Sequence, residues 1–171
     1  MIRTVERPQT CLCFVVRTGA DGRDEVLLGR KKRGLGAGKV VGLGGHVEPG
    51  EGAAQAAARE LAEESGLRVD PAALRPVAVV DWVFPARPAW DMWVTAFTVR
   101  DVPGEPAETD EIEPAWFPVD APPLDAMWDD ARYWLPQVLA GRFLRARIAF
   151  AADCEHVADA DVVLTEHPPA P

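Results

Sequence analysis

The segment that decides the fold runs from Gly45 to Leu67 and has the sequence GHVEPGEGAAQAAARELAEESGL. Its second part is made of Ala, Gln, Arg, Leu and Glu, which all favour a helix. Gly66 follows this run at the position where a glycine commonly ends a helix. We therefore predict a helix over Gly52–Ser65.

Three carboxylates gather on one side of this helix. At about 100° per residue, Glu60, Glu63 and Glu64 fall within an arc of roughly 100°, where like charges weaken a helix. One interpretation is a solvated acidic face, but such a face usually alternates with lysines, and the nearby cation, Arg59, lies on a different face. The other interpretation is a set of hard oxygen ligands for Mg²⁺, whose charge offsets the repulsion.

The sequence before and after the helix predicts the strands of a sheet. Thr10–Val16 and Glu25–Gly29 are apolar runs that predict a strand, a turn and a strand, and the glycine-rich basic segment Arg30–Lys39 predicts a loop. Further strands are expected at Val40–Gly45, Pro76–Phe84, Met92–Val102, Pro114–Val119 and Phe143–Ala151, with a second helix over Ala131–Ala140 that Pro136 could kink. This order predicts an α+β sandwich.

The bulk properties limit the function. The 171 residues fit one domain, residues 1–152, followed by a tail, residues 153–171, expected to fray except for a short strand at Val162–Leu164. The net charge of −9 argues against a partner that is a nucleic-acid polymer. Neither a membrane helix nor a signal peptide is apparent, so we expect a cytoplasmic protein, either a monomer or a homodimer.

Gly45–Leu67 resembles a complete Nudix box, with every specified position matched. The resemblance implies the Nudix α/β/α sandwich, with a mixed sheet between helices. It also implies that Mg²⁺, or Mn²⁺ in its place, is held by Glu60, Glu63 and Glu64 with a backbone carbonyl of Gly44 or Gly45. Arg59 would pair with Glu51 or a neighbouring carboxylate and orient these ligands.

Other segments resemble the animal oxidised-purine nucleoside triphosphate hydrolases, which are MutT-type Nudix enzymes. They are Val26–Gly38, Thr109–Phe117 and Met127–Pro136, and the similarity covers about Thr10–Phe150. It implies hydrolysis of purine nucleoside triphosphates such as 8-oxo-dGTP to a monophosphate and pyrophosphate.

The same resemblance assigns residues to the site. Glu111 would be an outlying metal ligand or assisting carboxylate, and Thr10 and Lys31 would contact the substrate. Trp128 would stack on the purine, although an indole at this spacing could equally be core packing. The remaining positions expected at the substrate are Val41, Leu43, Gly44, Gly45, His46, Asp129 and Asp130.

Base recognition departs from the family pattern. Val41 stands where the family has an asparagine, which removes a hydrogen-bonding group. Two aspartates directly follow Trp128, whereas the family has a spacer first, so an ungapped match leaves Ala131 at one aspartate position and a shift of one residue restores both.

Three hypotheses follow. The first is a Mg²⁺-dependent nucleoside triphosphate pyrophosphohydrolase. The second keeps the chemistry but changes the substrate to ADP-ribose, a sugar nucleotide, a dinucleoside polyphosphate, a prenyl diphosphate or capped RNA. The third is a non-catalytic nucleotide-binding module, which the self-repelling carboxylates disfavour.

Overall fold

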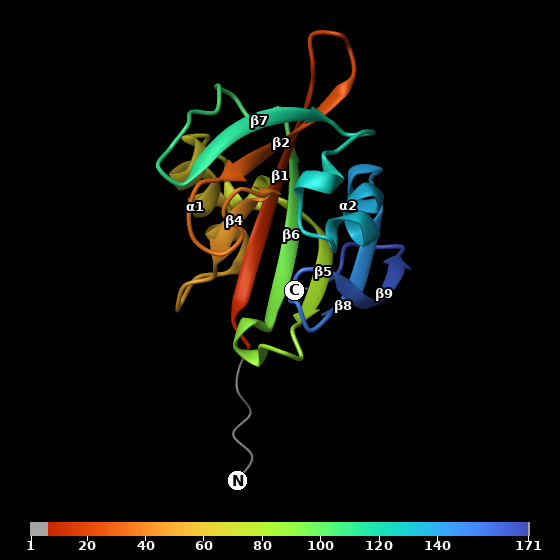
Figure 1. Ribbon diagram of the computed structural model, residues 1–171. Helices are drawn as coiled ribbons and strands as arrows, with labels where there is room; N and C mark the ends of the chain where they lie inside the picture. The colour runs from red at the N-terminus through yellow and green to blue at the C-terminus, as the bar shows by residue number, and fades with distance from the viewer. Residues whose placement is uncertain (1–6, 171) are drawn as a thin grey trace.

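The computed structural model describes residues 7–170. A mixed nine-stranded sheet lies between helices α1 (Ala53–Ser65) and α2 (Ala131–Leu139), which confirms the predicted α+β sandwich (Figure 1). The main strand order is β3 (Val40–Val41), β2 (Asp24–Lys31), β1 (Gln9–Thr18), β6 (Met92–Arg100), β5 (Arg75–Val83), β8 (Phe143–Phe150) and β9 (Val157–Thr165). Off this path, β4 (Leu43–His46) pairs with β1 and β7 (Ile112–Pro118) pairs with β2.

The sheet divides at β1. The first half of β1 pairs with β4, from Thr10 to Cys13, and its last residues pair with β2, from Val16 to Thr18. The other edge of β1 runs parallel to β6 along most of its length. β4 and β2 therefore share one edge of β1, and the candidate site lies at this division.

Each helix covers its own apolar cluster. Cys11 and Cys13 of β1 pack on the α1 side with Leu61, whereas Phe14 packs on the α2 side with Trp134. This separation follows from the alternation of side chains along a strand. Both cysteines are free and buried.

The predicted helix over Gly52–Ser65 is confirmed to within one residue. At its start the Gly52 N–H donates to Gln55 Oε1 at 2.8 Å. At its end Gly66 takes a φ of +76° and its N–H donates to the Ala62 carbonyl at 2.9 Å. A positive φ carries no steric penalty at glycine, which is why the helix ends there.

The structure differs from the sequence-based expectation in three places. Val40–Gly45 was expected as one strand but forms two, β3 and β4, separated at Gly42, where a β-carbon would crowd the Phe14 ring. β7 is longer than the short strand expected and pairs with β2 over seven residues.

The third difference lies in the expected tail. It forms the nine-residue strand β9 beside β8, and beyond it Pro169 is buried while Arg145 Nη2 donates to the Ala170 carbonyl at 2.7 Å. Within residues 7–170, no helix has the length and apolarity to cross a membrane.

Candidate active site

Arg59 is the centre of an ion-pair network on α1. Its Nε and Nη2 donate to both oxygens of Glu51 at 2.8 and 3.0 Å, and its Nη1 donates to Glu60 Oε1 at 2.9 Å. Nη1 also approaches Glu63 Oε2 at 3.3 Å, and Nη2 donates to the His46 carbonyl at 3.0 Å. The Arg59 guanidinium lowers the pKa of Glu51 to about 2. The network fixes the loop before α1 against the helix.

Glu64 and Glu60 face the glycine pair of β4. Glu64 is 7% exposed and its Oε2 accepts the Gly44 N–H at 2.9 Å; burial raises its pKa to about 8. Burial likewise raises the pKa of Glu60 above its usual value. A β-carbon at Gly45 would collide with the Glu60 carboxylate, and one at Gly44 with the Cys11 carbonyl. Gly44 is therefore required by the close approach of the Cys11 backbone, and a side chain at Gly45 would displace the Glu60 carboxylate.

Glu63 and Glu111 lie farther out. Glu63 is largely exposed, and Glu111 pairs with Arg33 Nη2 at 2.7 Å. Among the described residues, no three acidic, His or Cys side chains converge as a ready set of metal ligands. Glu60 and Glu64 nevertheless fit a hard divalent cation, because two partly desolvated carboxylates at one glycine pair repel each other until a cation joins them.

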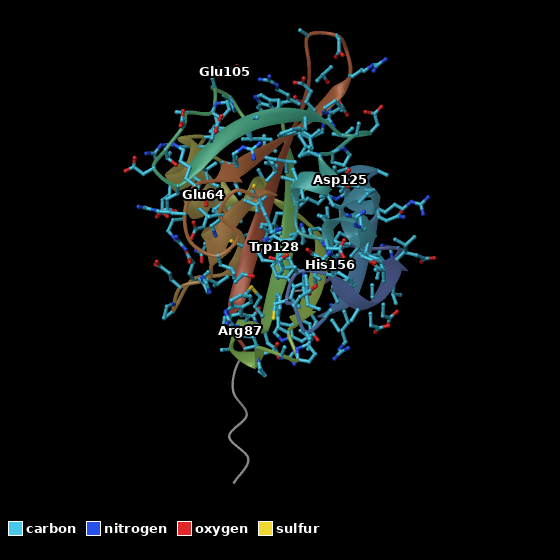
Figure 2. The ribbon with its side chains drawn as sticks, viewed as in Figure 1. Glu64, Arg87, Glu105, Asp125, Trp128 and His156 are labelled. Carbon is cyan, nitrogen blue, oxygen red and sulfur yellow. The ribbon has the colours of Figure 1, made fainter. Side chains whose placement is uncertain are left out.

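A pocket of about 240 Å³ opens beside these carboxylates and extends towards α2. Two of its lining residues, Glu64 beside α1 and Trp128, are labelled in Figure 2. The pocket is partly open to solvent and mostly apolar. Its walls include Thr10, Lys31, Val41, Gly44, Gly45, His46, Glu64, Trp128 and Asp130, all of which the sequence placed at the site.

Two of the expected substrate contacts are elsewhere. The Leu43 side chain is fully buried in the cluster under α1, because its neighbours in β4 take the pocket side. Asp129 accepts Arg132 Nε and the Val157 N–H, both at 2.8 Å, so it anchors the start of β9. Their expected roles at the substrate are not supported by these positions.

Asp130 and Ala131 are the residues after Trp128 that line the pocket, which corresponds to the ungapped match. Asp130 is 2% exposed and its Oδ2 accepts Trp134 Nε1 at 2.8 Å. Burial raises its pKa to about 6, although the Trp134 bond acts in the opposite direction. A buried acid that could have been an apolar residue suggests a functional role.

Trp128 both packs and lines the pocket. It meets Phe150 edge to face at a centroid distance of 6.4 Å, and Lys39 Nζ lies 4.9 Å from its ring centroid. Gly36 approaches the indole so closely that a β-carbon there would lie 2.9 Å from Nε1. The two interpretations of this residue are therefore compatible.

The basic loop, Arg30–Lys39, forms ion pairs with the rest of the protein instead of being surrounded only by solvent. Lys31 lines the pocket, as expected, but Lys32 Nζ pairs with Glu108 at 2.6 Å and Arg33 pairs with Glu111 at 2.7 Å. The segment that carries Glu108 and Glu111 therefore holds the basic loop beside the pocket.

The sequence matches the family described as NUDIX domain over residues 8–138. The chain belongs to the Nudix hydrolase family. Its relatives include the oxidized purine nucleoside triphosphate hydrolase of Danio rerio, 45% identical over 75% of this chain and 77% of that protein. The enzyme of the same name from Mus musculus is 45% identical over 67% of this chain and 71% of that protein.

Solved Nudix structures support the fold of this Nudix hydrolase. A mutator MutT protein from Bacillus halodurans has a TM-score of 0.75 and 22% identity, with 91% of this chain and 97% of that chain covered. A MutT NUDIX hydrolase from Burkholderia pseudomallei has a TM-score of 0.65 and 28% identity, with 78% and 98% covered.

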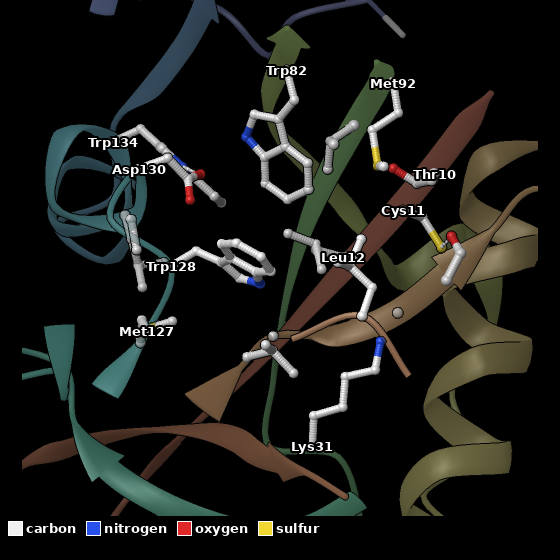
Figure 3. Close-up of a pocket in the computed structure, with 18 of the residues that line it drawn as sticks. Thr10, Cys11, Leu12, Lys31, Trp82, Met92, Met127, Trp128, Asp130 and Trp134 are labelled. Carbon is white, nitrogen blue, oxygen red and sulfur yellow. Dashed lines mark hydrogen bonds between the residues drawn. The ribbon is translucent and has the colours of Figure 1, made fainter. Parts of the chain in front are cut away.

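Several pocket residues of this Nudix hydrolase were not expected from sequence. Trp82, Phe84, Met92 and Met127 also line the pocket, and Figure 3 shows Trp82 between Trp134, on the α2 side, and Met92, beside Thr10. They lie in apolar strands or beside a helix, where the sequence pattern is the same for core and for pocket walls. Only the tertiary structure separates the two.

Proposed function

We propose that this Nudix hydrolase is a Mg²⁺-dependent nucleoside triphosphate pyrophosphohydrolase that acts on oxidised purine nucleotides such as 8-oxo-dGTP. The products are the nucleoside monophosphate and pyrophosphate. One observation carries the proposal: a single pocket joins an aromatic end, with Trp128 and Asp130, to a carboxylate end, with Glu64 beside Gly44.

The two ends suit the two halves of a nucleotide. The purine stacks on the Trp128 indole, a contact worth about 1–3 kcal/mol for a nucleic-acid base. The phosphates extend past Gly44 and Gly45, where backbone without side chains leaves room for them. Lys31, at the pocket wall, contributes the positive charge that a triphosphate needs in a protein with a net charge of −9.

Glu60 and Glu64, with a backbone carbonyl of the glycine pair, would hold the metal, and Glu63 and Glu111 would add outer contacts. When bound, Mg²⁺ polarises a phosphoryl oxygen, lowers the pKa of a water and screens the substrate charge; Mn²⁺ can substitute. Arg59 keeps Glu60 and Glu51 in place and is a positioning residue. The Gly44 N–H holds one Glu64 oxygen, which leaves the other for the cation.

A second candidate keeps this machinery for another diphosphate substrate. It is favoured by the apolar Val41 and Ala131 in the pocket wall, which offer a base no hydrogen bond. NAD-capped RNA hydrolases of Pseudomonas aeruginosa are also similar, at 41% identity over 123 residues, although the chain spans only 41% of their length.

Product analysis tests the proposal. Purified protein is given 8-oxo-dGTP, dGTP, 2-hydroxy-dATP, ADP-ribose and NAD-capped RNA with Mg²⁺ in ¹⁸O-water, and products are identified by mass spectrometry. We expect the oxidised purine triphosphates to turn over fastest, to give monophosphate and pyrophosphate, and to stop in EDTA. Release of orthophosphate, full activity in EDTA or faster cleavage of ADP-ribose or capped RNA would contradict it.

A further inference from the structure

The inner end of the pocket presents few polar groups to a ligand. Thr10, Lys31, His46 and Glu64 come from the strands and helix at the carboxylate end. At the other end the walls are apolar or aromatic, and there the Asp130 carboxylate and the indole N–H of Trp82 lie beside each other (Figure 3).

The Trp82 N–H has no acceptor among residues 7–170. Nε1 is buried and forms no hydrogen bond with any residue that the structure describes. Figure 3 shows its nitrogen on the side of the ring that faces Asp130 and Trp134, and the proximity of this N–H lowers the pKa of Asp130 even though the pair does not reach hydrogen-bond geometry. A buried donor without a partner is unfavourable, so an acceptor brought by a ligand gains from meeting it.

Asp130 complements this donor. Trp134 Nε1 donates to Oδ2, which leaves Oδ1 for a further donor. The pocket therefore offers, side by side on β5 and at the start of α2, one N–H that needs an acceptor and one carboxylate oxygen that needs a donor.

We propose that Trp82 is a specificity-determining residue that donates to the purine base, while Asp130 accepts from the neighbouring position. This inference rests on the proposed function. The pair selects a base edge on which an acceptor stands next to a donor, and it disfavours an edge with two acceptors, which would place a lone pair against the carboxylate.

The edge formed by O6 and N7 of guanine distinguishes the substrates. In guanine both atoms are acceptors. Oxidation at C8 puts a proton on N7, so 8-oxoguanine presents an acceptor at O6 and a donor at N7. That edge matches the Trp82 N–H and the Asp130 carboxylate, whereas intact guanine would leave Asp130 facing an acceptor. Adenine has a donor at N6 and an acceptor at N7, which is the reverse order. It would fit the Trp82 N–H and the Asp130 carboxylate only with the base turned over.

Trp82→Phe tests the role, because it keeps an aromatic ring and removes the N–H. Trp93→Phe is the matched control, since Trp93 is an exposed neighbour on β6 whose side chain does not line the pocket. Each variant is assayed with 8-oxo-dGTP, dGTP and the triphosphate of 2′-deoxynebularine, a purine without a substituent at C6 or C8.

We expect kcat/KM for 8-oxo-dGTP to fall about tenfold or more in Trp82→Phe, mainly through KM, as for a lost hydrogen bond to a base. The preference over dGTP should fall by a similar factor. Deoxynebularine triphosphate should change by less than about twofold, because stacking survives, and Trp93→Phe should match the unmodified protein. An unchanged preference in Trp82→Phe, or an equal loss for all three substrates, would overturn the role.

A binding readout separates this inference from the proposed function. In ¹⁵N-labelled protein the Trp82 indole N–H resonance is identified by its loss in Trp82→Phe, and 8-oxo-dGMP or dGMP is added without metal. We expect a downfield shift with 8-oxo-dGMP that exceeds the shift with dGMP. A Trp82 resonance that stays in place while the Trp128 resonance moves would refute the inference alone, whereas failure to hydrolyse any of the triphosphates would refute the function.

Discussion

Asp130→Asn should stabilise the protein at neutral pH while it impairs base recognition. Burial raises the pKa of Asp130 to about 6 from 3.8. Because the folded pKa exceeds the unfolded one, the stability that the protonated acid contributes is fully present below about pH 3.8 and is lost as pH rises through about 6. At roughly 1.4 kcal/mol for each pH unit, the loss is about 3 kcal/mol. Asparagine is neutral like the protonated acid, so a protein with asparagine at this position avoids the loss of stability.

The assay is urea unfolding followed by far-UV circular dichroism at about pH 4 and about pH 8. We expect Asp130→Asn to unfold at a higher urea concentration near pH 8, and at nearly the same concentration as the unmodified protein near pH 4. Asp125→Asn is the control, since it makes the same change in net charge at a fully exposed carboxylate, where effects are usually within about 0.5 kcal/mol.

The reasoning fails if Asp130→Asn is less stable than the unmodified protein at about pH 8, or if its advantage is the same at both pH values. Either result would mean that the bond from Trp134 to the ionised carboxylate outweighs the desolvation of the charge. If the gain in stability is found together with a weaker preference for 8-oxo-dGTP, the charge is retained at a cost in stability because the substrate requires it.

Three further perturbations test the rest of the site. Glu64→Gln should fold normally, since the amide keeps the volume and the contact with the Gly44 N–H, but lose about a hundredfold or more in kcat at saturating Mg²⁺; near-normal turnover would show that another carboxylate matters. Gly45→Ala should lower both activity and the melting temperature, because the added methyl collides with Glu60; an unaltered enzyme would disprove the close packing. Val41→Asn should raise the ratio of kcat/KM for 8-oxo-dGTP to that for dGTP, because it adds a donor and an acceptor to the pocket wall; an unchanged ratio would place base recognition elsewhere.

The sequence was sufficient for the elements that have strong local signals. The helix before Gly66 and its carboxylates followed from composition and spacing, and the strands β1 and β2 from their apolar runs. β9 was underestimated because its sequence alternates Ala and Asp before three apolar residues, so it lacks the pattern of a buried strand. It forms because β8 supplies a pairing edge, with Arg147 opposite Asp161, and such a long-range partner is not visible locally.

The site was predictable to the extent that polar chemistry marks a residue. The clustered charges on the helix were noticeable in the sequence, because like charges this close destabilise a helix unless a cation offsets them. They belong to Arg59, Glu60 and Glu64, which the structure brings together at the glycine pair. The sequence gives no comparable signal for Trp82, because an aromatic residue in a strand usually belongs to the core. The register after Trp128 was open in sequence, and it is the anchoring of Asp129 to β9 that turns Asp130 into the pocket.

The division of the sheet at β1 has a consequence for engineering. The carboxylate end rests on β4 and α1, where a β-carbon at Gly44 would collide with the Cys11 backbone and one at Gly45 with the Glu60 carboxylate, so that end tolerates little variation. The opposite wall is built from side chains of β5, β6 and the approach to α2, including Trp82 and Met92. A directed-evolution library restricted to that wall should therefore change which base is accepted, while the residues of the carboxylate end stay unchanged.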